Sequence, residues 1–197
     1  MPLSPCLLLI VPAQVTSPVG AQPLDQVQAL VGAIPEAFVQ GRAREVRGLV
    51  ARAKAGWERA RPELRGTLPE AELLFIDRQL KAMQAMKPRE QAVGALGIAG
   101  TLDRHQGRTR VLELRQAERA ALLAWCNVDA GMWEALPRVK EAFQPVLDQD
   151  RGAHPRAVAG TQEALKRLQA AQGKRRAPEA KQALRELVDL AKAFGKA

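Results

Sequence analysis

The chain has 197 residues, of which 47% are hydrophobic, so it can bury one substantial core but is short for two large independent domains. Aromatic residues make up only 4% and tyrosine is absent, while helix-forming residues such as Ala, Leu, Arg and Glu abound, which argues against a β-sheet protein. The net charge of +9 at pH 7 favours an anionic partner, although no single basic cluster dominates it. We expect an all-α protein.

Residues 1–21 have the pattern of a secretory signal peptide. An apolar stretch runs from Cys6 to Val15. The small residues Val19 and Ala21 occupy the two positions that signal peptidase recognises. No Lys or Arg precedes the stretch, which departs from the usual pattern, and the stretch is too short to span a bilayer. We expect a periplasmic or secreted protein whose mature chain begins at Gln22. The alternative is an unprocessed cytosolic chain.

Removal of that segment would leave Cys126 as the only cysteine. An intramolecular disulfide, a cysteine-rich zinc site and a c-type haem attachment would then be excluded. A nucleophilic cysteine needs a neighbouring base, and the sequence assigns no histidine to Cys126. We therefore expect this thiol to be buried for structural reasons.

The first half of the chain begins with residues 22–41, which we interpret as a short N-terminal helix or linker, interrupted at Pro35 and closed near Gly41. From residue 42 to residue 64, apolar side chains recur at spacings of three and four, which predicts an amphipathic helix that ends close after Pro62. Its buried face would consist of Val46, Leu49, Val50, Ala53 and Trp57.

The next predicted helix begins near Pro69, with acidic residues in its first turn, where they favour the helix dipole. Pro88 either kinks this helix or starts a new one that reaches about His105. Three glycines of that segment would let neighbouring helices approach closely: Gly94, Gly97 and Gly100. The inward face of the helix after Pro69 would carry Leu73, Ile76, Leu80 and Met83.

In the second half, the pattern predicts one long helix over residues 109–147, bent near residues 127–131 and again at Pro137. A loop then leads to an amphipathic helix over residues 155–172. A last helix follows Pro178 and ends near Phe194.

The two halves share a phrase. Trp57 and Trp133 are each followed by Glu and, four or five residues later, by a proline, Pro62 or Pro137. Further on, "LKAMQAMKPREQ" resembles "LKRLQAAQGKRR" at a similar offset. We infer an internal duplication. The fold would be a helical bundle of two similar three-helix repeats, residues 42–106 and 107–197, packed as one domain, and the four residues of the shared phrase would be structural.

This pattern resembles uncharacterised secreted or periplasmic helical-bundle proteins, in which duplicated helical hairpins share a Trp followed by Pro near the end of a helix. The resemblance covers roughly residues 42–195 and implies a bundle outside the cytoplasm, without naming an activity. Some similar extracytoplasmic helical domains accompany iron uptake, so a metal site has to be considered.

Iron-binding helical domains of the imelysin type and di-iron bundles use His and carboxylates at helical spacing. His105 and His154 have no carboxylate three residues away, which removes most of the support for such a site. In "RELVD", Glu186 and Asp189 lie one turn apart and could share a cation, although a solvated face is the simpler interpretation. The remaining metal candidates are Asp103, His105, Glu186 and Asp189, and no cofactor is predicted.

The chain contains no nucleophile elbow, phosphate-binding glycine loop or paired catalytic carboxylate motif, so we expect no enzymatic activity. The predicted function is that of an exported binding or accessory module for an extracytoplasmic protein partner or an anionic surface. A periplasmic bundle that binds a metal or small ligand is the first alternative. Nucleic-acid binding is a second alternative, if the chain is not exported.

Overall fold

The computed structural model describes residues 23–105, 109–128 and 130–195. These residues form eight α-helices and one 3₁₀ helix without any strand, so the all-α prediction is confirmed. Within the described residues, no helix combines the length and apolar character needed to cross a membrane. The predicted signal peptide, its cleavage site before Gln22 and the predicted boundary between residues 106 and 107 lie outside the described residues.

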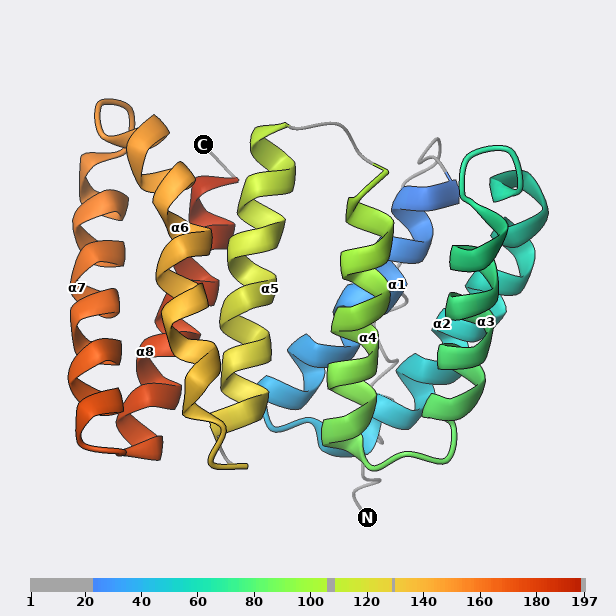
Figure 1. The fold of residues 1–197 in the computed structure, drawn as a ribbon, viewed down its shortest axis with the longest axis horizontal. Coiled ribbons are helices and arrows are strands. Elements are labelled where there is room, and N and C mark those ends of the chain that lie inside the picture. Colours follow the sequence, from blue (N-terminus) through green and yellow to red (C-terminus); the bar gives the residue numbers. More distant parts are fainter. Residues whose placement is uncertain (1–22, 106–108, 129, 196–197) are drawn as a thin grey trace, which may run out of the picture.

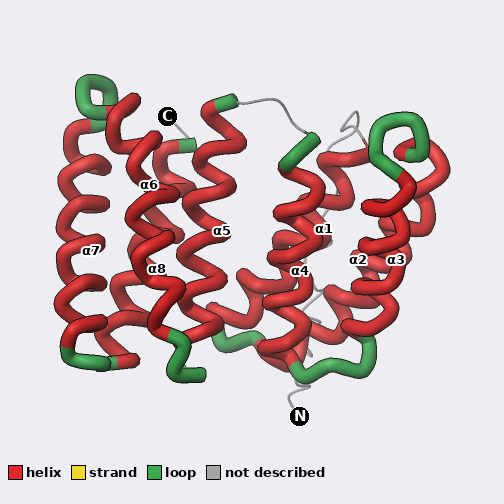
Figure 2. The backbone as a smooth tube through the Cα atoms, in the orientation of Figure 1, coloured by secondary structure: helices red, strands yellow, loops and turns green. Residues whose placement is uncertain are grey.

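The first half of the structure is an up-and-down bundle of four helices (Figure 1). They are α1 (Pro23–Val39), α2 (Ala43–Leu64), α3 (Glu70–Met83) and α4 (Pro88–Asp103). The second half repeats this arrangement with α5 (Arg110–Val128), α6 (Leu136–Asp150), α7 (Pro155–Gly173) and α8 (Ala177–Phe194), and the 3₁₀ helix η1 (Trp133–Ala135) leads into α6. In both halves, the first helix lies against the second and the fourth. Loops that are mostly short join these helices (Figure 2).

Each half has its own apolar core. The first core consists mainly of side chains from α1 to α4, and the second of side chains from α5 to α8. Phe38 packs against both clusters, and Val39, Ala92 and Leu96 extend from the first half into the second core. The two bundles therefore lie side by side and touch through a limited set of residues.

Several sequence predictions for the first half are confirmed. All five residues of the predicted α2 face and all four of the α3 face are buried. Pro88 starts a new helix, whose first turn is capped where the backbone N–H of Lys87 donates to Glu90, 3.0 Å away. A Cβ at Gly94 would lie 2.7 Å from Gln79 Nε2, so this glycine does allow α3 and α4 to approach, whereas Gly97 has open space beside it.

Of the two interpretations of residues 22–41, helix or linker, the structure has a helix from Pro23 to Val39, and Pro35 does not interrupt it. Pro35 lies inside α1, which continues to Val39. A proline removes one backbone hydrogen bond, and tertiary packing here outweighs that loss because α1 lies against α2 and α4 with a fully buried apolar face. Each half therefore has four helices instead of the predicted three, while the internal repeat stays a prediction.

The prediction of one long helix over residues 109–147 is wrong in its continuity, since two helices form, but both breaks lie where bends were predicted, near residues 127–131 and at Pro137. The chain leaves the helix at Val128 and turns through Gly131, whose φ of +72° favours glycine. Pro137 then occupies the first turn of α6, where its missing N–H costs no helical hydrogen bond. The two prolines therefore have different roles, since Pro62 lies near the end of α2.

Trp57 and Trp133 do not occupy equivalent places. Trp57 lies in the interior of α2 and is 1% exposed, whereas Trp133 lies in η1 and is only partly buried. The counterpart of Trp57 is Phe143, because each lies seven residues before the end of the second helix of its half and is fully buried. The shared Trp and Pro phrase therefore lies at different points of the two halves.

The halves meet where α1 and α4 lie against α5, and α1 runs obliquely to α5 (Figure 1). Phe38 and Trp125 pack edge to face at 5.6 Å between ring centroids, and Lys181 Nζ lies 4.0 Å from the centroid of Trp125. Near these rings, Arg185 of α8 donates to the carbonyl of Val39, and Arg89 of α4 donates to the carbonyl of Cys126, at 2.7 and 2.8 Å. Thus α8 supplies a donor to a carbonyl near the end of α1, and α4 supplies one to a carbonyl near the end of α5.

Candidate partner-binding groove

A groove of about 880 Å³ lies between α6 and α7. Its apolar lining comes from Leu136, Leu147, Leu165 and Leu168, with Pro137 at one end. Glutamines follow both rims, and Gln172 Nε2 lies 3.5 Å from the carbonyl of Trp133 at the same end. We call this feature the α6–α7 groove.

Three of the five buried residues of α7 are small, which lets this helix lie close to α8. Thr161, Ala164 and Ala171 face the core, and a Cβ at Gly160 would lie 3.4 Å from Leu190 of α8. Small residues let two helices approach closely, so α7 packs tightly against α8. The backbone contact between α6 and α7 is no sparser than that between α2 and α3, so the two halves differ in their side chains. No hydrogen bond or ion pair joins α6 to α7 among the residues that the structure describes.

The corresponding contact in the first half is closed by side chains. Trp57 Nε1 of α2 donates to Asp77 of α3 at 2.6 Å, and Arg61 Nε lies 2.9 Å from the same carboxylate. Glu70 adds a longer ion pair to Arg61 at 3.7 Å. The phenyl ring of Phe143, which replaces Trp57 in the second half, has no donor with which to bridge the two helices.

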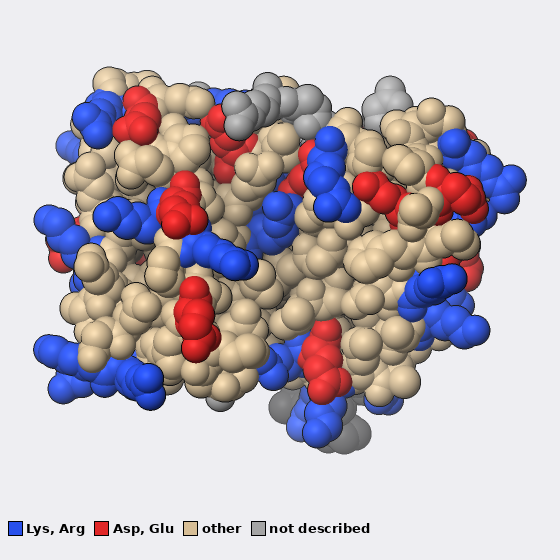
Figure 3. Space-filling model, viewed as in Figure 1, with Lys and Arg blue, Asp and Glu red and all other residues tan. Residues whose placement is uncertain are grey.

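The rim of the α6–α7 groove is mainly basic. Lys140, Arg151 and Lys166 line it, against the single acidic residue Glu141. Lys140 and Lys166 are exposed. Basic side chains are prominent over this part of the molecule in the space-filling view (Figure 3). An apolar floor between basic rims complements a segment with an apolar stripe and acidic flanks.

The metal candidates predicted from sequence are dispersed. Asp103 is buried at the end of α4, where Oδ1 accepts a hydrogen bond from Gln28 Nε2 at 3.0 Å and Oδ2 pairs with Arg119 of α5. Burial raises the pKa of Asp103 above its usual value, while Arg119 and Arg115 act in the opposite direction. This carboxylate therefore ties α1, α4 and α5 together.

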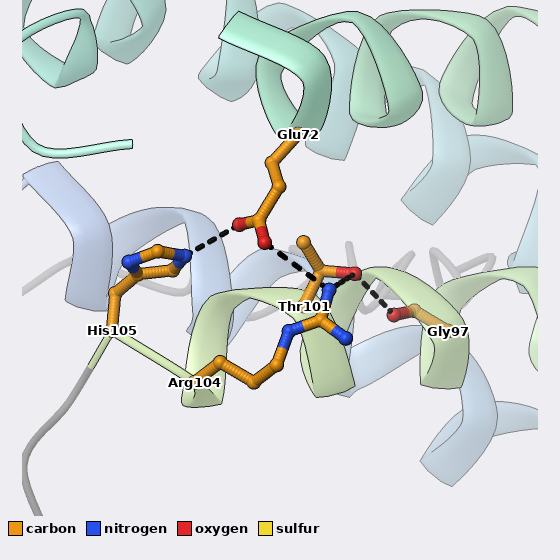
Figure 4. Close-up of polar contacts among 5 residues, drawn as sticks. All are labelled: Glu72, Gly97, Thr101, Arg104 and His105. Atoms are coloured by element: carbon orange, nitrogen blue, oxygen red, sulfur yellow. Dashed lines mark hydrogen bonds and ion pairs between the residues drawn. The ribbon is translucent and has the colours of Figure 1, made fainter. Parts of the chain in front are cut away.

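His105 lies just beyond α4 and contacts Glu72 of α3 at 2.5 Å (Figure 4). Arg104 approaches the other carboxylate oxygen of Glu72 at 3.3 Å. Thr101 donates to the carbonyl of Gly97, one turn earlier in α4. The sequence showed no carboxylate three residues from His105, because its partner Glu72 comes from another helix.

Glu186 and Asp189 lie on α8, away from His105 and its partner. Glu186 forms a bidentate ion pair with Arg167 of α7, and Asp189 lines a small hollow where α8 faces α1 and α5. The four candidates thus have separate surroundings. Among the residues that the structure describes, no three His, Cys, Asp or Glu side chains are grouped so that they could hold a metal ion.

The remaining single-residue prediction concerns the thiol. Cys126 is buried at 1% exposure, as expected for a structural cysteine. Sequence reasoning missed the charged residues of the junction between the halves, above all Lys192 of α8, whose Nζ lies 3.0 Å from Glu36 of α1 and 3.5 Å from Glu118 of α5. Burial disfavours the ammonium of Lys192, but these two carboxylates outweigh that effect and raise its pKa.

Comparisons with protein-family models, with curated proteins and with solved structures find no match for this chain. The resemblance to secreted helical-bundle proteins therefore stays a prediction. The functional argument rests on the geometry of the chain itself.

Proposed function

We propose that this protein is a non-catalytic binding module that acts outside the cytoplasm and docks a partner protein in the α6–α7 groove. The observation that carries the proposal is the difference between two corresponding helix contacts, one closed by Trp57 and Asp77 and the other left open. Leu165 is half-buried in the groove, and Leu136, Leu147 and Leu168 beneath it are already only 3–5% exposed, so a partner would cover mainly Leu165 and the polar rims. Export is supported by the signal-like pattern of residues 1–21.

The partner that fits is an acidic amphipathic helix. The groove extends along α6 from Leu136 to Arg151, which corresponds to about 22 Å of helix at 1.5 Å per residue. A helix of about four turns would therefore fill it. Leucines on one face would contact the floor, and acidic residues on both flanks would meet Lys140, Arg151 and Lys166.

The test uses a synthetic 16-residue helical peptide, with leucines spaced three and four apart and glutamates on the flanks. A peptide with lysines in place of the glutamates is its control. We expect the glutamate peptide to bind with the higher affinity in a fluorescence anisotropy titration, and salt to weaken it. Equal affinity for both peptides would contradict the proposal.

A matched pair of variants locates the binding site. Lys166→Glu lies on the groove rim, whereas Lys81→Glu makes the same charge change at an exposed position of α3. We expect Lys166→Glu to weaken the glutamate peptide about threefold to tenfold, as reversal of one rim charge does, and Lys81→Glu to leave it nearly unchanged. Equal losses in both variants would show a non-specific charge effect and remove the groove from the proposal.

Export is tested separately, by the intact mass of the protein from its native host after separation of the compartments. A chain that begins at Gln22 and lies outside the cytoplasm would support export. An unprocessed cytosolic chain would overturn export without affecting the peptide result, and salt-dependent binding to nucleic acid would then be the next measurement.

A further inference from the structure

A second hollow lies at the junction of the two halves, separate from the α6–α7 groove. It has a volume of about 380 Å³, within the range of small-molecule sites, and it is lined by α1, α4 and α5. Figure 3 shows the recess between α4 and α5, with charged side chains set back inside it. Its position between two rigid bundles is where ligand sites often form.

Small residues create the space. Ala29, Gly32 and Ala33 of α1 face Ala99 of α4 across the hollow, and Leu96 and Leu122 complete its apolar surface. A Cβ at Gly32 would meet no atom within 4 Å. The hollow is therefore a space between helices that pack firmly elsewhere, with room for a bound group beside α1.

The charged lining has two ends. At one end, Arg115 Nη1 donates to Gln28 Oε1 at 2.7 Å, and Gln28 in turn donates to Asp103, which is paired with Arg119. At the other end, Glu36 and Glu118 share the single ammonium of Lys192. Carboxylates outnumber guanidinium groups four to two in the lining, because Asp25 and Glu36 join Asp103 and Glu118 against Arg115 and Arg119. An acidic lining is notable in a chain of net charge +9.

One carboxylate oxygen of this lining has unused capacity. Glu118 Oε1 is shielded from solvent and accepts no hydrogen bond from any residue that the structure describes, although Lys192 lies 3.5 Å away. Burial raises the pKa of Glu118; Lys192 opposes the shift and Glu36 adds to it. The Glu118 side chain is 21% exposed, and together with Glu36 it has, in the part of the chain that the structure describes, only the ammonium of Lys192 as an ion-pair partner, which leaves one negative charge of the three groups unbalanced. A ligand that brings a positive donor would balance that charge.

We propose that this cavity binds a small organic cation, an ammonium group on an apolar body, with Glu118 and Glu36 facing the ammonium. The apolar body would lie against Gly32, Ala33 and Leu96. If each non-hydrogen atom takes about the volume of one water, the cavity holds a ligand of about a dozen such atoms. Arg115 and Arg119 also line the cavity and disfavour a second positive charge, so a monocation is the matching class.

The test compares three probes of nearly equal size that differ in charge: benzylammonium, benzyl alcohol and benzoate. Binding to the full chain is followed at neutral pH by calorimetry and by the backbone amide signals of α1 and α5. We expect benzylammonium to bind about tenfold more tightly than benzyl alcohol, as one charge-assisted hydrogen bond allows, and benzoate to bind more weakly than either. Benzoate binding as tight as benzylammonium, or no binding of any probe, would overturn the proposal.

Two pairs of variants locate the site. Gly32→Leu fills the cavity and should abolish binding of benzylammonium and benzyl alcohol, whereas Gly32→Ala, which adds only a methyl group to open space, should retain it. Glu118→Gln removes the charge with little change of shape and should reduce the preference for benzylammonium about tenfold. Glu163→Gln, at an exposed position of α7, should leave the preference unchanged. Retention of binding by a folded Gly32→Leu protein, or of the preference by Glu118→Gln, would place the ligand elsewhere and overturn the proposal.

Discussion

The two halves of the molecule share the order and direction of their helices, but they fill the space between the second and third helices in different ways. In the first half, the inward residues of α3 are large, and Trp57 reaches Asp77. In the second half, three of the five buried residues of α7 are small, and Phe143 offers no polar bridge. The difference shows how a common bundle can keep one half as a closed scaffold while the other half gains an open groove.

The largest expected effect comes from truncation of the two corresponding aromatic residues. Trp57→Ala and Phe143→Ala should each reduce the free energy of unfolding by about 3–5 kcal/mol, since both side chains are fully buried. The loss of stability in Trp57→Ala should lie at the upper end of this range, because the change also removes the hydrogen-bond donor to Asp77. Urea unfolding with a common m-value measures both, and a smaller loss for Trp57→Ala would break the comparison.

The polar bridge itself is tested by Asp77→Ala. This change leaves the indole N–H of Trp57 and the guanidinium of Arg61 without their carboxylate, at a cost of about 1–3 kcal/mol. The control is Gln162→Ala, because Gln162 is the eighth residue of α7 as Asp77 is of α3, and it should change stability by less than about 0.5 kcal/mol. Similar losses in both variants would mean that the bridge contributes nothing particular to the first half.

Transfer of the bridge to the second half sharpens the comparison. Phe143→Trp alone should cost about 1–3 kcal/mol by overpacking, and addition of Gln162→Asp should recover about 1 kcal/mol by accepting the indole hydrogen bond. The double variant should also bind the glutamate peptide more weakly, because the bridge would cross the α6–α7 groove. Additive effects of the two substitutions on unfolding would show that their side chains do not meet.

The smallest effect concerns the junction, where charged residues are buried in contrast to the apolar interiors of the halves. Because the pKa of Glu118 is raised in the folded state, its charged form reduces stability at neutral pH, and protonation restores that stability as pH falls through the raised value towards the unfolded value of 4.5. The stability of the wild-type protein relative to Glu118→Gln should therefore increase between pH 7 and pH 4.5. The unfolding free energies of both proteins are measured across this pH range. Because Glu36, Lys192 and Arg115 are present in both proteins, the difference between them reports on Glu118. A decrease would show that the ion pair with Lys192 dominates.

Much of the fold was predictable from sequence because most helices have a clear apolar face and proline or glycine at their ends. The α2 and α3 faces were predicted residue by residue. The long helix over residues 109–147 was wrong because Ala, Leu and Glu continue through residues where only Gly131 and Pro137 signal the turn. The error at Pro35 was the reverse. Its sequence predicted an interruption of the helix, but burial of α1 outweighs the hydrogen bond lost at the proline.

The candidate sites were less predictable because they depend on contacts between helices. Asp103 and His105 were singled out from the sequence, but their partners, Arg119 and Glu72, come from other helices. The α6–α7 groove did leave a signal, since small residues recur on the inward face of α7 where α3 has large ones. That signal becomes readable only when the four-helix unit, with Phe143 in the place of Trp57, is known.

The separation of the two apolar cores also bears on how the chain folds. Each core draws nearly all its residues from one continuous stretch of sequence, and contacts between helices that are near in sequence form quickly. The first half has almost its complete core once α4 has been synthesised, so it can fold before α5 exists. Phe38 and Val39 are then left exposed at the end of α1, as a nucleus on which Trp125 and the second half assemble.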